Sequence, residues 1–179
     1  LGMNDHISEP LTWDNNRKYD RGKVLDEAGL DSVEKWGRYL DVDGDGIPYR
    51  TIPATHPTKG AFVTRGSSRN AYAAYTEDSG EYKMNMDRLA KKFETAANIV
   101  PKPHFYQESN GSEVGVLFFG TSRFATEEAI ELLKDEGITL DAMLVKSFPF
   151  GKEFIDFVES HSKVFVIEQN RDSQFKSMM

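Results

Sequence analysis

The stretch that decides the fold is VGVLFFGTS (Val114–Ser122), an apolar run that ends at a glycine and is followed by small polar residues. A short, continuous apolar run is typical of a strand that is buried on both faces. Gly120 ends the run, and Ser122 can cap a helix that begins there. The stretch therefore predicts a buried strand that leads directly into a helix.

The residues after Ser122 continue this alternation. Apolar residues recur at helical spacing between Ala125 and Leu133, and Gly137 stands where a helix would end. Two further apolar stretches, 142–145 and 164–167, predict strands, and 154–158 predicts a short helix between them. Strands and helices that alternate with short connections favour parallel pairing. We predict an α/β fold, a three-layer α/β/α parallel sheet, and we expect its edges to need strands from elsewhere.

The first half of the chain differs in amino-acid composition. It is poor in aliphatic residues, yet it contains many aromatic residues separated by glycines and prolines. Disordered segments are depleted in aromatic residues, so an ordered arm that lies against another surface is the better interpretation. An amphipathic helix is predicted from 81 to 99, and Pro101 and Pro103 end it. We expect three segments: an extended interaction arm (1–80), a connecting helix and linker (81–103) and an α/β domain (104–179).

The amino-acid composition argues against several classes of function. The chain has 22 basic and 29 acidic side chains, a net charge of −7, which argues against nucleic-acid binding through a basic surface. No apolar run reaches the roughly 20 residues that a membrane-spanning helix needs. Cysteine is absent, so this chain supplies no disulfide, thiol nucleophile or cysteine-bound cluster. No secretory leader is visible, and we expect a cytoplasmic protein.

The stretch DVDGDG (Asp41–Gly46) resembles the first half of a calcium-binding EF-hand loop. Asp41, Asp43 and Asp45 stand at the alternate positions that supply ligands, and a glycine follows. The loop's closing glutamate is missing, because Ile52 occupies its position. Two interpretations stay open: a calcium site through these three aspartates, or turns in which the carboxylates bond to nearby backbone N–H groups.

Eight blocks in order carry a resemblance to a known family. They are YDRGKVL (19–25), WGRYLDVDGDGIPYRT (36–51), THP (55–57), TRGSS (64–68), YTED (75–78), MDRLAKKFETA (86–96), FPFG (148–151) and VIEQNRD (166–172). Together they resemble the C-terminal part of the α subunit of 2-oxoacid:ferredoxin oxidoreductases, the 2-oxoglutarate type especially.

The resemblance implies a thiamine-diphosphate-dependent complex that decarboxylates a 2-oxoacid, makes acyl-CoA and reduces ferredoxin. It implies that thiamine diphosphate, Mg and the iron–sulfur cluster are held elsewhere in the complex, the thiamine and cluster by the β subunit, so that this chain alone binds no cofactor. It implies a likeness of 104–179 to the transketolase C-terminal domain. The expected partners are the thiamine-binding β subunit, the rest of the α subunit and, through the complex, ferredoxin. The isolated chain is expected to be inactive.

No catalytic residue is predicted, because the four histidines show no metal-ligand or triad spacing and no G-x-G-x-x-G follows a strand. Arg50, His56, Arg65 and Arg69 place cationic and donor groups in the irregular half, where they suit an anionic 2-oxoacid or the phosphates of coenzyme A. Of these, Arg50, His56 and Arg65 are expected near the mouth of the active site. The alternative is that they cap loops or pair with carboxylates of a partner subunit. Glu168 and Arg171 are expected to tie the end of their strand to a neighbouring element, and ligand binding is the alternative.

A rival class is a flavodoxin-like binding or regulatory module that carries an aromatic interaction arm. Flavin binding requires a phosphate-cradling loop, for which Gly120–Ser122 is short. A third class, a calcium-binding protein, depends only on Asp41–Gly46.

Overall fold

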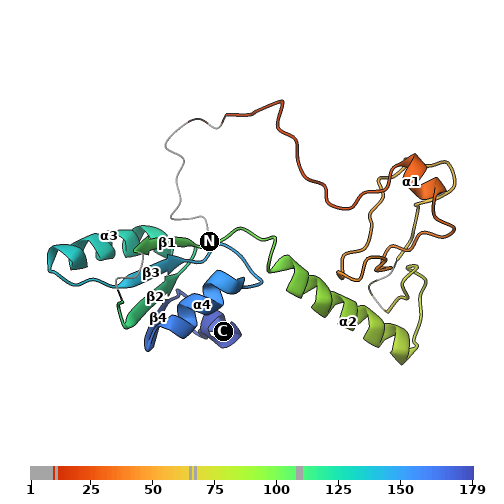
Figure 1. Ribbon diagram of the computed structural model, residues 1–179. Helices are drawn as coiled ribbons and strands as arrows, with labels where there is room; N and C mark the ends of the chain where they lie inside the picture. Colours follow the sequence, from red (N-terminus) through yellow and green to blue (C-terminus); the bar gives the residue numbers. More distant parts are fainter. Residues whose placement is uncertain (1–9, 11, 65, 67, 108–110) are drawn as a thin grey trace. The chain divides into compact units, whose positions relative to one another are not determined.

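The computed structural model describes residues 10, 12–64, 66, 68–107 and 111–179. The chain forms two compact units, Trp13–Ala96 and Ala97–Met179, and each is described by itself (Figure 1). The part of the chain that the structure describes contains no helix whose length and apolar character would let it cross a bilayer.

The 97–179 unit is built on a four-stranded sheet with the order β1–β3–β2–β4. The strands are β1 (His104–Gln107), β2 (Val114–Phe118), β3 (Asp141–Leu144) and β4 (Lys163–Ile167). β2 lies between β3 and β4 and pairs in parallel with both, so that Val116 is opposite Ala142 on one side and Phe165 on the other. The predicted α/β fold with parallel pairing of these three strands is confirmed.

The sheet differs from the predicted all-parallel one at its β1 edge. β1 runs antiparallel to β3, with an irregularity between Phe105 and Gln107, so the sheet is mixed. The sequence did not predict this strand because it has only four residues, begins and ends with polar residues and directly follows Pro103. Edge strands are partly exposed, so they do not need the apolar run that marks a buried strand.

Helices cover both faces of the sheet and make the predicted three layers (Figure 1). α3 (Ser122–Asp135) packs through Ile130 on the face that carries Val116 and Phe118. α4 (Lys152–Ser160) and α5 (Gln174–Met178) cover the opposite face, where Leu117 lies. Side chains alternate along β2, so consecutive residues enter different cores. The second core is rich in aromatic rings: Phe154, Phe157 and Phe175 join Leu117 and Met143.

A buried histidine joins the end of α4 to the start of β3. Nε2 of His161 lies 3.0 Å from Oδ2 of Asp141, and Nδ1 lies 2.6 Å from the carbonyl oxygen of Phe157. The two side chains are only 3% and 5% exposed. Both neighbours of the ring are acceptors, so both nitrogens can donate only when the ring is doubly protonated. The geometry therefore fits a buried ion pair. Gly115 makes room for it, since an added Cβ would lie 2.9 Å from the Phe157 ring.

We expect His161→Ala to lower the free energy of unfolding by about 3 kcal/mol, because removal of one partner leaves the Asp141 carboxylate buried and unpaired. Urea denaturation of the 179-residue chain, followed by circular dichroism, measures this change. Lys134→Ala, on the exposed side of α3, is the control and should change stability by less than about 0.5 kcal/mol. Equal effects of the two substitutions would contradict the buried pair.

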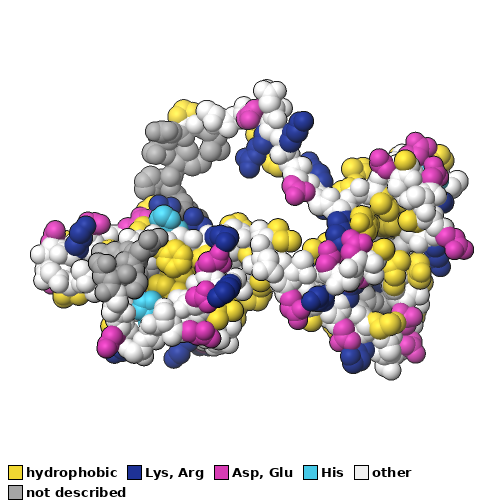
Figure 2. Space-filling view, viewed as in Figure 1, with side chains coloured by type: hydrophobic (Ala, Val, Ile, Leu, Met, Phe, Trp, Pro, Cys, Tyr) yellow, Lys and Arg dark blue, Asp and Glu magenta, His cyan; other side chains and the backbone are white. Residues whose placement is uncertain are grey.

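The 13–96 unit is held together differently. Its helices are α1 (Glu27–Asp31) and α2 (Ser79–Ala96), and the remainder of its described residues form loops and turns with two isolated bridges. Among the described residues of this unit, the buried apolar side chains are Leu30, Ala73 and Pro48. Hydrophobic side chains instead reach the surface in number (Figure 2), Trp13 at 75% exposure among them. Hydrogen bonds and ion pairs must therefore stabilise much of this unit.

Candidate functional site

The Asp41–Gly46 stretch folds as a series of Asp–Gly turns. The two carboxylate oxygens of Asp41 accept the N–H groups of Gly44 and Gly46, at 2.9 and 2.8 Å, and Oδ1 of Asp45 accepts the N–H of Ile47 at 2.9 Å. Gly44 and Gly46 have φ values of +76° and +79°, in the left-handed region that favours glycine. The alternating Asp and Gly pattern thus meets a local need of the backbone.

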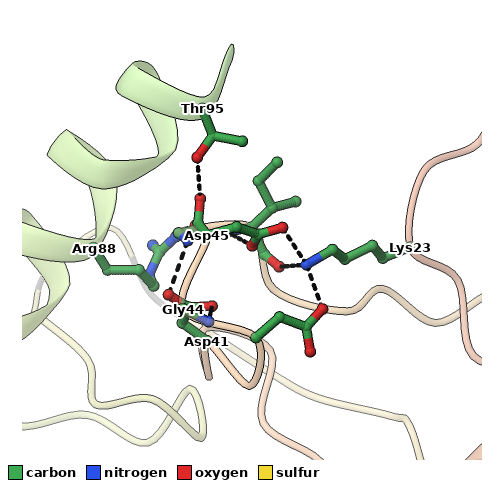
Figure 3. A network of polar contacts seen from close by, with 9 residues as sticks. Lys23, Asp41, Gly44, Asp45, Arg88 and Thr95 are labelled. Atoms are coloured by element: carbon green, nitrogen blue, oxygen red, sulfur yellow. Dashed lines mark hydrogen bonds and ion pairs between the residues drawn. The ribbon is translucent and has the colours of Figure 1, made fainter. Parts of the chain in front are cut away.

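Lys23 neutralises the other two aspartates. Its Nζ lies 2.6 Å from Oδ2 of Asp43 and 2.5 Å from Oδ2 of Asp45 (Figure 3). Desolvation opposes the charged form of Lys23, but the hydrogen bonds to Asp43 and Asp45 prevail and raise its pKa. The hydrogen bond from Lys23 in turn lowers the pKa of Asp45. A metal ion at this loop would have to displace the lysine.

No group of three or more metal-binding side chains occurs within the described ranges. The calcium hypothesis for Asp41, Asp43 and Asp45 remains a hypothesis, and the geometry gives all three carboxylates other partners.

The loop is fastened to α2 along one face of that helix. The hydroxyl of Thr95 donates to the carbonyl of Asp45 at 2.6 Å, and Nη1 of Arg88 donates to the carbonyl of Gly46 at 3.1 Å (Figure 3). A Cβ added to Gly46 would lie 2.3 Å from the backbone nitrogen of Lys92. The backbone of the loop therefore touches the backbone of the helix, which only glycine allows.

Gly46→Ala is expected to destabilise the 13–96 unit by about 3 kcal/mol or more, because the left-handed φ and the contact with α2 both oppose a Cβ. Gly44→Ala is the matched control: its φ is similar, but nothing lies within 4 Å of an added Cβ, so about 1 kcal/mol is expected. Both tryptophans, Trp13 and Trp36, lie in this unit, so urea denaturation followed by tryptophan fluorescence reports on it directly. Equal destabilisation by the two substitutions would rule out the close contact with α2 as the cause.

His56, predicted to lie near substrate, fixes a loop to α1. Its Nδ1 accepts the N–H groups of Thr58 and Lys59, at 3.1 and 2.8 Å. The proton of the neutral ring is then on Nε2, which lies 3.0 Å from Oδ1 of Asp31. Nζ of Lys59 donates to the carbonyls of Leu30 and Val33, both at 3.0 Å, and strengthens the same attachment.

Of the other two residues predicted to lie near substrate, Arg50 is described by the structure and Arg65 is not. The backbone of Arg50 is bonded to the segment that carries Lys23: its N–H donates to the Lys23 carbonyl at 2.7 Å, and its carbonyl accepts from Leu25 at 2.9 Å. Its side chain is exposed. Arg65 lies outside the described residues. Among the contacts of the described part of the chain, Arg50 and His56 share no partner.

The structure brings together a serine, a histidine and an aspartate that the spacing in the sequence did not predict as a group. Ser160, His161 and Asp141 come together, with Oγ of Ser160 3.2 Å from Nδ1 of His161. Nδ1 lies closer, at 2.6 Å, to the carbonyl of Phe157, so it carries a proton and cannot accept one from the serine. The three residues therefore form a structural group and not a nucleophilic triad.

The carboxyl end of β3 opens into a cavity of about 260 Å³. Lys102, Lys146 and Lys152 line it, with the start of α4 at Gly151. Lys102 is paired with Glu153, and Lys152 with Asp156 one turn further along α4. Glu168, just after β4, ties this edge to α5 as expected, since its carboxylate accepts the N–H groups of Phe175 and Lys176. Desolvation works against its charge, but these backbone donors and the Asn170 amide lower its pKa. Arg171, of which the same was expected, is 91% exposed and pairs with the adjacent Asp172.

Comparison with known proteins identifies the chain's relatives. No family model matches it. The α subunit of 2-oxoacid:ferredoxin oxidoreductase 2 from Aeropyrum pernix is 29% identical over 164 residues, which cover 89% of this chain and 24% of that protein. This chain resembles the α subunit of 2-oxoacid:ferredoxin oxidoreductases. The resemblance predicted from its eight sequence blocks is confirmed.

A solved structure matches the chain at the level of fold. The 2-oxoglutarate:ferredoxin oxidoreductase from Magnetococcus marinus, with 2-oxoglutarate, coenzyme A and succinyl-CoA bound, matches 82% of this chain with a TM-score of 0.69 and 20% identity. The match covers 26% of that oxidoreductase chain. The chain thus spans about a quarter of the length of each of these oxidoreductase relatives.

Proposed function

We propose that this chain is a non-catalytic, structural and subunit-interface part of a thiamine-diphosphate-dependent 2-oxoacid:ferredoxin oxidoreductase that makes acyl-CoA and reduces ferredoxin. The observation that carries the proposal is the identity with an oxidoreductase α subunit over 89% of the chain. 2-Oxoglutarate is the proposed substrate, in line with the ligands named for the Magnetococcus enzyme. The proposed partners are the β subunit, the rest of the α subunit and ferredoxin.

The donor groups of this chain do not fit the implied cofactors. Iron–sulfur clusters are held by cysteine thiolates, and this chain has no cysteine. The Mg ion that accompanies a diphosphate needs oxygen ligands, yet the described residues contain no group of three metal-binding side chains. Thiamine diphosphate, Mg and the cluster are therefore assigned, within this proposal, to other parts of the complex.

An interface role suits the surface of the 13–96 unit. Its exposed aromatic side chains are Trp13, Tyr19, Phe62, Tyr72, Tyr75, Tyr82 and Phe93. Aromatic residues are enriched where protein surfaces meet, because one ring buries a large area at a small cost in conformational entropy. A unit with few buried apolar residues gains most from such a contact.

The isolated 179-residue chain is expected to give no viologen reduction above the blank with 2-oxoglutarate, coenzyme A and added thiamine diphosphate and Mg. The complete complex that contains the same segment should reduce viologen under the same conditions. Turnover by the isolated chain would refute the non-catalytic role, and a complex without 2-oxoacid-dependent activity would refute the oxidoreductase assignment.

Within the complex, Arg50, His56 and Arg65 are proposed to lie near the mouth of the active site, with His56 orienting its loop. Arg50→Ala should raise the KM for 2-oxoglutarate or coenzyme A about tenfold and leave kcat within about twofold, because an exposed guanidinium that attracts an anion contributes to binding before the chemical step. Steady-state kinetics of the complete complex measures both constants. Arg171→Ala is the control, since its side chain is 91% exposed and paired with Asp172. Unchanged constants for Arg50→Ala would exclude it from the site.

A further inference from the structure

Three arginines surround the ring of Tyr39 in the 13–96 unit. The guanidinium carbons of Arg38, Arg69 and Arg88 lie 5.4, 5.5 and 5.9 Å from the centre of the ring. Arg38 precedes Tyr39 in the chain, Arg69 belongs to a distant loop, and Arg88 comes from α2. Three separate segments thus bring like charges to one ring, here called the Tyr39 arginine cluster.

Within the described ranges, the charges of Arg38 and Arg88 are not balanced by carboxylates that touch them. In the described ranges, no ion pair joins Arg38 or Arg88 to an acidic side chain. Asp41 acts on Arg88 from farther away, but both of its oxygens already accept N–H groups of the loop. The Tyr39 ring offsets a part of the repulsion, since the face of an aromatic ring attracts a cation.

The nearby positive charge and partial burial affect the guanidinium of Arg88. Desolvation, and then the charge of Arg38, lower the pKa of its guanidinium. Its Nη1 donates to Gly46, but its buried Nε has no hydrogen-bond acceptor among the described residues. Buried donors without an acceptor are costly and uncommon in folded proteins. A chain with a net charge of −7 therefore concentrates positive charge and an unused donor at one place.

We propose that the Tyr39 arginine cluster is a binding site for the phosphate group of a small molecule. Guanidinium groups recognise phosphate and carboxylate through two parallel hydrogen bonds. A carboxylate has two oxygens and one negative charge, which suffice for one such fork. A phosphate has three peripheral oxygens and a charge of about −2 near neutral pH, so it can engage several guanidinium groups at once. This site is independent of the oxidoreductase proposal.

Calorimetric titration of the 179-residue chain with inorganic pyrophosphate, at fixed ionic strength, tests the site. Saturable binding is expected, and Arg38→Gln should weaken it about tenfold or more, since one charge-assisted hydrogen-bonded pair accounts for at least that factor. Arg38 is the first choice because Arg88 also holds Gly46. Arg88→Lys, which keeps the charge and removes the fork, should give an intermediate loss.

Arg21→Gln is the matched control, because Arg21 also lies over a tyrosine ring, 5.6 Å from the centre of Tyr19, outside the cluster. It should leave pyrophosphate affinity unchanged. Succinate, a dicarboxylate without a phosphate group, should bind at least about tenfold more weakly than pyrophosphate. Equal losses for Arg38→Gln and Arg21→Gln, equal affinity for succinate, or no pyrophosphate binding by the folded chain would each overturn the proposal.

Discussion

The 13–96 unit depends on the close approach of Gly46 to the backbone of α2. A unit that buries so few apolar side chains gains little from the hydrophobic effect, which contributes about 25 cal/mol for each Å² of apolar surface removed from water. Its loops must be held by directional bonds, and the Asp–Gly loop meets α2 through two of them, from Thr95 and Arg88. Those bonds form only because a glycine lets the two backbones touch. The aspartates on either side then prepare the turn, and Lys23 makes their charges tolerable.

The 97–179 unit is stabilised mainly by apolar burial, and less by directional polar bonds. β2 lies between two parallel strands and sends alternate side chains into two cores, so its position follows from burial alone. One polar exception is the His161–Asp141 pair at the amino end of β3. A buried ion pair adds little to stability compared with an apolar pair, but it fixes how α4 meets the sheet, because the ring reaches both Asp141 and the last turn of α4.

The difference between a unit held by apolar burial and a unit held by polar bonds explains what could be predicted from the sequence. The runs at 114–119 and 142–145 predicted parallel strands because burial on both faces requires an unbroken apolar stretch. The run at 164–167 also predicted a strand, although β4 lies at an edge of the sheet and is partly exposed. β1, at the other edge, was not predicted because its four residues HFYQ contain no such apolar run. In the irregular half, the turns of Asp41–Gly46 could be predicted from local residue chemistry. Lys23 could not be identified as their partner, because 20 residues separate it from Asp43 and no periodicity links the two positions.

For the candidate site residues too, residue chemistry could be read from the sequence, but contacts between distant segments could not. His56 was selected for its chemistry, yet its ring is occupied by the backbone of its own loop and by Asp31, contacts that a sequence pattern does not show. Arg69 was selected for its chemistry too, but its grouping with Arg38 and Arg88 around Tyr39 was not predicted because the three arginines are far apart in the chain. Once the fold joins them, local charge matters more than net charge. The acidic groups of the nearby loop are already neutralised by Lys23 or by backbone N–H groups, so they have little capacity left for the arginines. The interactions that close the Asp–Gly loop on α2 therefore also leave a surplus of positive charge beside it.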